Sequence, residues 1–396
     1  MRWLAALSIG CYGDPLGTLD LVGSDTGTRP GTGGTGAETD TGTETSTDTG
    51  GSDTGTETGT ETGTGTTGTG TDPIEADLEV CADGSALFTE IQDAIDVSAP
   101  GDVIAVCPGT YGPIEVLWSF DVTIVSTGGP ASTVIDGGAD TAVFVRDGTL
   151  SLSGFRLDGT GVDEPWSTDH GAALTVEEGD VTVSDCVVDR VTGPFALVFD
   201  ENLLVLDGVS WTDNDTDLLW FLWQGDDAVI THNTVTGGVH HGVIAAERLD
   251  QLHLSNNVFD RITIDTAQTA FELETTGTGP MVLENNVFHD IDDLDPWGGR
   301  LFTGTLTFRN NIVAGSAAGD LVPIDASYSL FWDNQLDYGP FVTGIGNQYV
   351  DPEWVDPAAG DFHLGPASPA IDAGDPNQRF DDADGTRSDV GRYGGE

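Results

Sequence analysis

Lysine is absent from this chain of 396 residues, and its 12 basic residues are all arginine. Acidic residues number 67, which sets the formal net charge at −55. Most of these acids follow residue 72, so the acidity belongs mainly to the part of the chain that can fold. A field of this sign repels phosphate backbones and anionic lipid headgroups. Nucleic acid and anionic membrane surfaces are therefore not expected as partners, and salt adaptation or solubility is the simplest reason for the acidity.

Long apolar runs are missing too, and no stretch approaches the ~20 residues that span a bilayer. The first residues, MRWLAALSIGC, contain one arginine, a short apolar stretch and then Gly10 and Cys11. They resemble a bacterial lipoprotein signal, which implies that Cys11 is lipidated and becomes the first mature residue. The pattern departs at Ser8, where the signal has leucine. We expect membrane association only through an N-terminal lipid, and a single acyl chain anchors a protein marginally.

Large apolar residues are absent between positions 24 and 72, which hold almost only Gly, Thr, Asp, Glu and Ser. Such a segment cannot offset the entropy of ordering and is expected to be a disordered, charge-extended tether. The chain is thus divided into an export segment with the start of the mature chain (1–23), the tether (24–72) and a folded domain (73–396). This layout predicts a protein displayed at the bacterial cell surface, in the manner of an outer-membrane lipoprotein.

One short amphipathic helix is predicted at the start of the folded domain, within Ser85–Val97. The sequence APGD ends it, and Val103–Tyr111 follows as a strand that runs into a Pro-Gly turn. The apolar residues at helical spacing are Leu87, Phe88, Ile91, Ala94 and Ile95.

A repeat fills the rest of the domain. LHLSNNVF (252–259), MVLENNVF (281–288) and LTFRNNIV (306–313) share alternating apolar residues, two asparagines and two further apolar residues. Weaker copies lie at 150–157, 181–188, 203–210 and 228–235. The second asparagine recurs at spacings of 29 and 25 residues. A period in the twenties with strand-like alternation inside it is typical of a parallel β-helix.

Stacking explains why such a repeat folds. Each turn of chain lays short strands on the previous turn ~4.8 Å away, and alternate side chains fill the interior. An asparagine stacked on asparagine satisfies its own amide and the backbone of a tight bend. We count about nine rungs from Val103. The open ends of a β-helix are strand edges that need a cover, and the helix within Ser85–Val97 is placed to cap the first rung.

Two segments resemble known proteins. FTEIQDAIDVSAPGDVIAVCPGTYGPIEV resembles the opening of right-handed parallel β-helix proteins of the pectin-lyase-like superfamily. The C-terminal segment 361–396 is similar to the end of surface proteins described as having a choice-of-anchor Q domain. With the repeats, the resemblance covers roughly residues 80 to 395 and implies an exported, all-β, right-handed parallel β-helix. The superfamily includes lyases, hydrolases, epimerases and members without assigned activity.

Only four cysteines occur, and four in a chain that looks exported indicate at least one disulfide. Cys81 and Cys107 lie on either side of the predicted helix, on strands expected to be neighbours, so we predict that they are bonded. Closing a loop of that length contributes ~3 kcal/mol. Cys186 falls where later repeats carry the second asparagine and is expected to be a buried free thiol.

Repeat counting gives the histidine-rich stretch GGVHHGV a context. His241 lies 13 residues before Leu254, the central apolar residue of its repeat, and His170 lies 13 residues before Val183. The same phase in the two intervening repeats selects Thr192 and Asp217. We therefore predict that Asp217 and His241 lie on adjacent rungs, in the turn entering a strand. A carboxylate beside a histidine raises the pKa of the imidazole and can orient it as a base.

Asp226 and Asp227 complete the candidate catalytic set. Trp166 and Trp297 follow the similar sequences DEP and LDP, in loops before the same strand, where they can stack on sugar rings. The alternative for the histidines is turn chemistry alone, and for the tryptophans it is the covering of a sheet edge.

Asp382 and Asp384 in DDADG have the spacing of calcium ligands in a loop, although no glutamate stands at the twelfth position. The alternative is a turn with solvated carboxylates. Apart from calcium at this place, no cofactor is expected.

Two functions follow from these residues. The first is a non-catalytic, monomeric surface β-helix that binds a polysaccharide or cell-surface glycan, or that serves structurally. The alternative is a carbohydrate-active enzyme, namely a polysaccharide lyase, epimerase or glycoside hydrolase. An enzyme should bring carboxylates, histidine or arginine together on one face of the β-helix, whereas scattered side chains favour binding or scaffolding.

Overall fold

The computed structural model describes residues 75–117, 120–138, 140–159, 172–189, 191, 196–199, 203–212, 216–223, 227–247, 249–264, 271–274, 279–292, 305–316, 324–335 and 342–395. They belong to the second of two compact units of the chain, Gly70–Glu396. The predicted export segment with Cys11 and the predicted tether lie outside the described residues. No helix in the described ranges is long and apolar enough to cross a bilayer.

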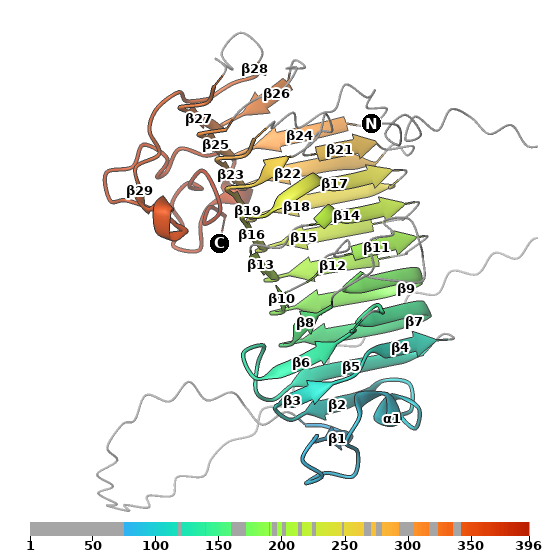
Figure 1. The fold of residues 1–396 in the computed structure, drawn as a ribbon. Helices are drawn as coiled ribbons and strands as arrows, with labels where there is room; N and C mark the ends of the chain where they lie inside the picture. Colours follow the sequence, from blue (N-terminus) through green and yellow to red (C-terminus); the bar gives the residue numbers. More distant parts are fainter. Residues whose placement is uncertain are drawn as a thin grey trace, which may run out of the picture. The chain divides into compact units, whose positions relative to one another are not determined.

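Parallel strands stacked in sequence order make up nearly all of the described structure (Figure 1). In the smaller of the two long sheets, each strand pairs with the strand of the same sheet that comes next along the chain. Val258 thus pairs with Thr234, and Val287 pairs with Val258. Its strands are β3 (Gly109–Tyr111), β6 (Thr133–Asp136), β8 (Arg156–Asp158), β10 (Val187–Asp189), β13 (Ser210–Thr212), β16 (Thr234–Thr236), β19 (Val258–Asp260), β23 (Val287–His289), β25 (Ile312–Ala314) and β27 (Leu330–Trp332).

The larger sheet holds the other two strand segments of each rung. The long strand β9 pairs through its first part with β11 and through its last part with β12, so one path divides into two strands in later rungs. The strands are β1 (Leu78–Val80), β2 (Asp102–Val106), β4 (Ile114–Leu117), β5 (Asp121–Ser126), β7 (Val143–Ser153), β9 (Leu174–Ser184), β11 (Ala196–Phe199), β12 (Leu203–Asp207), β14 (Thr216–Trp223), β15 (Asp227–Thr231), β17 (Val239–Glu247), β18 (Gln251–Ser255), β20 (Thr263–Ile264), β21 (Phe271–Glu274), β22 (Pro280–Glu284), β24 (Thr305–Arg309), β26 (Ile324–Ser327) and β28 (Val342–Thr343).

This topology is that of a parallel β-helix, so the predicted fold class is confirmed. Alternate residues of the strands point inward, as the buried Leu150 and Leu152 of β7 illustrate. One continuous apolar core runs from Val80 in β1 to Val342 in β28, the last strand of the larger sheet. Burial of this core, together with the backbone ladder between rungs, stabilises the stack.

From β7 onward, each described corner between the larger and the smaller sheet contains a left-handed residue. Asn256, Asn285 and Asn310 have φ of 55°, 56° and 55°, and they are the first members of the predicted asparagine pairs. Asparagine tolerates this conformation better than most residues because its short side chain bonds locally. Gly208 occupies the same corner in an earlier rung with a φ of 67°. The local backbone therefore explains the first asparagine.

The second asparagine of each pair points inward and forms the predicted stack. The Nδ2 of Asn257 donates to the Oδ1 of Asn286 at 2.9 Å, and the Nδ2 of Asn286 donates to the Oδ1 of Asn311 at 3.0 Å. Asn233 extends the ladder by one rung, with 3.0 Å from its Nδ2 to the Oδ1 of Asn257. Each Nδ2 also donates to a backbone carbonyl of the preceding rung. All four side chains are buried, and this prediction is confirmed.

Cys186 takes the same inward position in an earlier rung. Its Sγ accepts the backbone N–H of Phe155 at 3.4 Å, as an asparagine oxygen does further along the ladder. Burial raises the pKa of the Cys186 thiol to about 12. The predicted buried free thiol is therefore confirmed, and it stays protonated at neutral pH.

The N-terminal helix is shorter than predicted. Helix α1 spans only Ile91–Ile95, and its buried residues Ile91, Ala94 and Ile95 belong to the core. Leu87 is 85% exposed, so its predicted place on the apolar face of a helix is wrong. The reason lies in the backbone, because Phe88 forms a parallel bridge with Val80 and keeps the preceding residues from joining the helix. The predicted disulfide between Cys81 and Cys107 is present.

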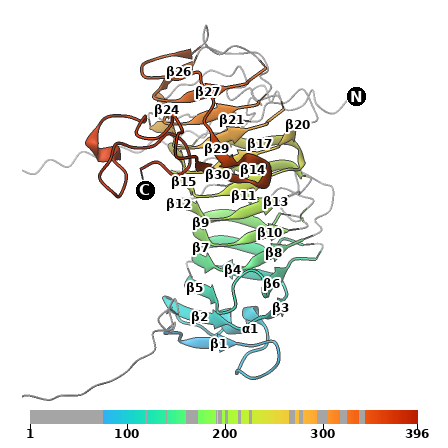
Figure 2. The same cartoon turned by 90° about the vertical axis from the view of Figure 1, so that its left-hand side faces the viewer.

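The C-terminal segment folds back along the outer face of the smaller sheet (Figure 2). It contains β29 (Trp354–Asp356), the 3-10 turns Pro357–Ala359 and Gln378–Phe380, and β30 (Asp361–Leu364), which pairs antiparallel with β29. Aligned outward residues of four rungs are buried against Phe362, Ala370 and Val390 of this segment. These four residues are Val258, Val287, Ile312 and Leu330.

The corner asparagines bind the same segment. Asn256 donates from Nδ2 to the carbonyl oxygens of Arg392 and Gly394, at 2.7 and 3.0 Å. The Oδ1 of Asn310 accepts the backbone N–H of Asp375 at 2.8 Å. Arg392 donates in return to the carbonyl oxygen of Asn233 at 2.9 Å. The two asparagines of a pair thus have separate structural roles, one toward the core and one toward the C-terminal segment.

Asn257→Ala is expected to lower the free energy of unfolding by about 2–4 kcal/mol, since it leaves two buried groups of Asn233 without their acceptor. Urea unfolding followed by circular dichroism measures the loss. The exposed Gln335→Ala serves as the control and should change stability little. A loss for Asn257→Ala no larger than that of the control would show that the ladder is not a stabilising element.

Candidate functional site

The Asp217 and His241 positions correspond on the adjacent strands β14 and β17. This register matches the one that repeat counting predicts. The residues that pair on either side are Thr216 with His240 and Leu218 with Gly242. The side chains of Asp217 and His241 lie outside the described part of the structure, so their chemistry stays a prediction.

The di-histidine does not lie in a turn, and that part of the prediction is wrong. Strand β17 begins at Val239 and already includes His240, which pairs with Ile264 of β20 as well as with Thr216 of β14. The turn is made instead by Gly237 and Gly238, with φ of 71° and 89°. Because those two glycines absorb the left-handed geometry, the backbone is extended by the time it reaches the histidines.

Asp227 is the first residue of β15, the strand that follows β14 along the chain. Its Oδ1 accepts a hydrogen bond of 2.8 Å from the Nε2 of Gln251 on the next rung. This carboxylate is therefore engaged in a contact between rungs. The remaining predicted catalytic residues, His170 and Asp226, and the predicted stacking residues, Trp166 and Trp297, lie outside the described residues.

Asp382 and Asp384 act in turns of the C-terminal segment. Asp382 accepts backbone N–H groups of Asp389, at 3.1 Å, and of Gly395, at 2.6 Å. Burial, followed by the charges of nearby aspartates, raises the pKa of Asp382 above its usual value. Asp384 accepts the N–H and the hydroxyl of Thr386 at 2.8 and 2.7 Å. The calcium site stays a prediction. In the structure both carboxylates accept hydrogen bonds from backbone N–H groups of the C-terminal segment.

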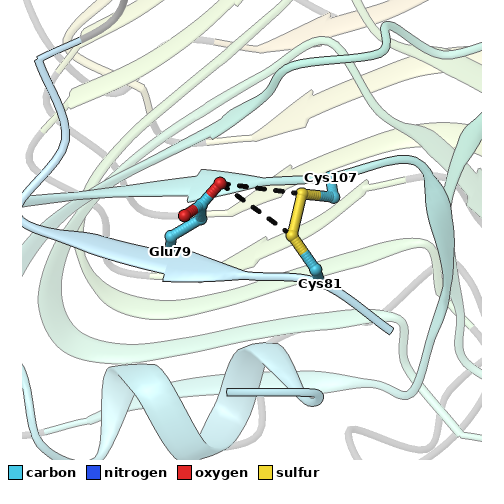
Figure 3. A group of neighbouring side chains, drawn as sticks. All are labelled: Glu79, Cys81 and Cys107. Atoms are coloured by element: carbon cyan, nitrogen blue, oxygen red, sulfur yellow. Dashed lines mark hydrogen bonds between the residues drawn. A yellow bond between two sulfur atoms is a disulfide. The ribbon is translucent and has the colours of Figure 1, made fainter. Parts of the chain in front are cut away.

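One compact group of three side chains able to ligate a metal occurs among the described residues, and it is the one around the disulfide (Figure 3). It consists of Glu79, Cys81 and Cys107, whose ligand atoms lie within 4.8 Å of one another. The two sulfur atoms are bonded to each other, so neither is available as a thiolate ligand. In the oxidised protein this group is a structural link between the ends of β1 and β2.

A polar cluster that the sequence analysis missed lies on three adjacent strands of the larger sheet, β18, β22 and β24. The Nε2 of His253 lies 3.0 Å from the Oε1 of Glu284, and the guanidinium of Arg309 pairs with the other oxygen of that carboxylate. Arg309 also lies 3.8 Å from the ring centre of Phe380 in the C-terminal segment. The repeat alignment carried a signal for it, because Glu284 and Arg309 each stand directly before an asparagine pair.

Opposing effects act on the carboxyl of Glu284. Burial by itself raises its pKa, but hydrogen bonds from His253 and Arg309, together with their charges, outweigh burial and hold the pKa below its usual value. Glu284 is therefore an anion at neutral pH. Its bridging position leaves it unable to serve as a proton donor, whereas His253, with 44% of its side chain exposed, is oriented by it.

Every histidine whose side chain the structure describes is bonded to a carboxylate. Two of these histidines contact aromatic rings of the C-terminal segment. His289 meets Phe362 edge-on at 5.3 Å between ring centres, and His363 stacks on Tyr393 at 3.9 Å. The first contact joins strand β23 to the C-terminal segment, and the second lies within that segment. The pairs are His232 with Asp207, His253 with Glu284, His289 with Asp260, and His363 with Asp361, at 2.6, 3.0, 2.7 and 2.7 Å.

Similar solved structures include the pectate lyase Pel9A, at 11% identity and a TM-score of 0.42, covering 80% of this chain and 96% of that one. A pectin methylesterase from carrot has 10% identity, a TM-score of 0.27 and coverages of 75% and 100%. The pectin methylesterase PemA from Erwinia chrysanthemi has 11% identity, a TM-score of 0.27 and coverages of 69% and 81%. No family model and no curated protein matches the sequence. Such distant similarities assign no activity; the strand topology itself defines the class, a parallel β-helix protein.

Glu284→Gln is expected to lower the free energy of unfolding by about 1–3 kcal/mol at pH 7, because His253 and Arg309 lose an anionic partner. Since the folded pKa of Glu284 is lowered, its contribution is present above the unfolded pKa of about 4.3 and is lost as pH falls through the folded value. Urea unfolding at pH 7 and near pH 3 should therefore show a difference between wild type and variant that shrinks in acid.

The exposed Glu178→Gln is the matched control for charge removal. It should change stability by less than about 0.5 kcal/mol at both pH values. A Glu284→Gln deficit that is the same at both pH values would contradict the assigned role of the ionised carboxylate.

Proposed function

We propose that this protein is a non-catalytic β-helix of the bacterial cell surface that binds a polysaccharide or serves as a rigid scaffold. The observation that carries the proposal is that described histidines and arginines are engaged in contacts within the chain. The four histidines whose side chains the structure describes are each paired with a carboxylate, and Arg309 and Arg392 hold the C-terminal segment. A catalytic centre instead requires groups that meet substrate from one face.

The outer face of the larger sheet supports the binding role. Ser184, Asp207 and Thr231 are half-buried residues of β9, β12 and β15 that pair in register on three successive rungs. Hydrogen-bonding groups that recur from rung to rung at ~4.8 Å offer similar contacts along a line. A polymer with a regular repeat meets such a surface in register, whereas a small molecule uses only one or two rungs.

A carbohydrate-active enzyme is the second candidate, and one observation favours it. The register of β14 and β17 aligns Asp217 with His241, the carboxylate–histidine arrangement that can supply a general base. A lyase, an epimerase or a hydrolase acting on polysaccharide is compatible with that pair. This candidate requires that Asp217 and His241 face a bound sugar.

Surface display rests on the N-terminal sequence. Lipidation of Cys11 would attach the mature chain to a membrane, and residues 24–72 would extend the β-helix away from it. The high negative charge keeps such a displayed domain soluble and away from anionic headgroups. A disulfide between Cys81 and Cys107 suits an oxidising compartment.

Cys11→Ser tests the anchor. We expect the wild-type chain, produced in a bacterium that makes lipoproteins, to incorporate labelled fatty acid and to sediment with membranes. The variant should lose the label and appear in the soluble fraction, because the thioether-linked lipid cannot form. Cys186→Ser, which alters a buried thiol, is the control and should keep the label. Labelling that persists in Cys11→Ser would disprove lipidation at this residue.

A polysaccharide panel separates the two functions. The full chain is incubated with neutral, acidic and amino-sugar polymers, with and without calcium, and both retention on the polymer and release of soluble fragments are measured. We expect retention without fragments, and the same retention for Asp217→Asn and His241→Ala. Fragments released by the wild type and not by His241→Ala would establish the enzyme. If the protein is neither retained on any polymer nor releases fragments from one, polysaccharide binding is excluded for the panel and only the scaffold role remains.

A further inference from the structure

Glu79 stands beside the disulfide of the first rung. Its Oε1 lies 4.0 Å from the Sγ of Cys81 and 3.9 Å from the Sγ of Cys107, and Figure 3 shows the carboxylate between the two strands and directed at both sulfurs. Sulfurs joined in a disulfide carry no proton, so these contacts are not hydrogen bonds. They place an exposed carboxylate against the disulfide, which cross-links the ends of β1 and β2.

The two sulfurs differ in accessibility. Cys81 is 2% exposed, whereas Cys107 is partly exposed. An attacking thiolate therefore reaches the sulfur of Cys107, forms a mixed disulfide there and displaces Cys81 as a thiolate. A second thiol of the reductant then attacks the mixed disulfide and releases Cys107. In the whole exchange two external thiols become one disulfide, and the protein disulfide becomes two protein thiols.

Glu79 opposes this exchange in two ways. The approaching thiolate must enter the field of the carboxylate next to Cys107. The departing charge then forms on Cys81, a buried sulfur that lies equally close to the same carboxylate. A thiolate that is both desolvated and beside an anion is a poor leaving group, and poor leaving groups slow thiol–disulfide exchange.

We propose that Glu79 protects the Cys81–Cys107 disulfide from reduction by anionic thiols. An exposed glutamate would ordinarily be taken as a solubilising residue, but the position of this carboxylate beside both sulfurs gives it an effect on thiol–disulfide exchange. The structural consequence is large for one residue, because the disulfide secures the terminal strand β1, which has a long pairing partner only on the side of β2. The protection keeps this end of the β-helix closed where small anionic thiols are present.

Glu79→Gln in the full chain tests the proposal. Protein is exposed to glutathione, samples are alkylated at intervals, and the peptides that contain Cys81 and Cys107 are quantified by mass spectrometry. We expect reduction about five-fold faster than in wild type at low ionic strength, and an advantage that falls toward one at 1 M salt because an exposed charge is screened. With cysteamine, whose ammonium group offsets the thiolate, the gain should be smaller.

Matched variants keep the result interpretable. Asp93→Asn removes an exposed carboxylate from helix α1 and should leave the rate unchanged. Glu79→Asp withdraws the charge by one methylene and should give an intermediate rate, which a general loosening of the fold would not produce. Equal rates for wild type and Glu79→Gln, or equal acceleration by Glu79→Gln and Asp93→Asn, would overturn the proposal. The experiment measures only the rate of disulfide reduction, so a negative result would not bear on the proposed surface function.

Discussion

The hydrogen bonding of the corner between the two sheets is the constraint on which this β-helix depends. From β7 onward, each described corner turns through a left-handed residue and buries the next one, whose polar backbone has no access to water. The asparagine ladder meets both demands, because the outer asparagine adopts the turn and the inner one supplies a donor and acceptors to its neighbours. A buried polar column is stable only when every member is satisfied. Cys186 and Phe155 show that earlier rungs close the same corner with less polar groups.

The C-terminal segment turns that repetitive scaffold into an asymmetric one. Outward residues of the smaller sheet are partly exposed in early rungs, as Ser210 and Thr234 are, and become the buried Val258 and Val287 where the segment covers them. The corner residues change along with them: Gly208 and His232 stand at earlier corners, whereas the covered corners have asparagines whose side chains bind carbonyl groups of the segment. Arg309, His289 and Arg392 form contacts between the segment and the β-helix, so part of the described charge attaches the chain to itself.

Sequence reasoning succeeded where the signal was periodic. Recurrence of Asn257, Asn286 and Asn311 predicted both the fold and the inward ladder, and counting rungs predicted the register of Asp217 with His241. It failed where the determining contact was local and irregular. The bridge from Phe88 to Val80 shortened the helix, and the paired glycines before β17 moved the turn away from the histidines. Neither contact has a period, so no alignment of the repeats could reveal it.

By itself, the sequence determined the class of fold and the buried thiol, because stacked rungs repeat the same inward positions. It also determined the disulfide pairing, because Cys81 and Cys107 lie on strands that stack next to each other. Only the tertiary structure decided how the C-terminal segment lies, how His253, Glu284 and Arg309 meet, and how Glu79 faces two sulfurs. These contacts join side chains distant in the sequence or on opposite strands. Their geometry depends on the exact stacking of rungs, since a shift of one residue would turn each side chain to the other face of its sheet.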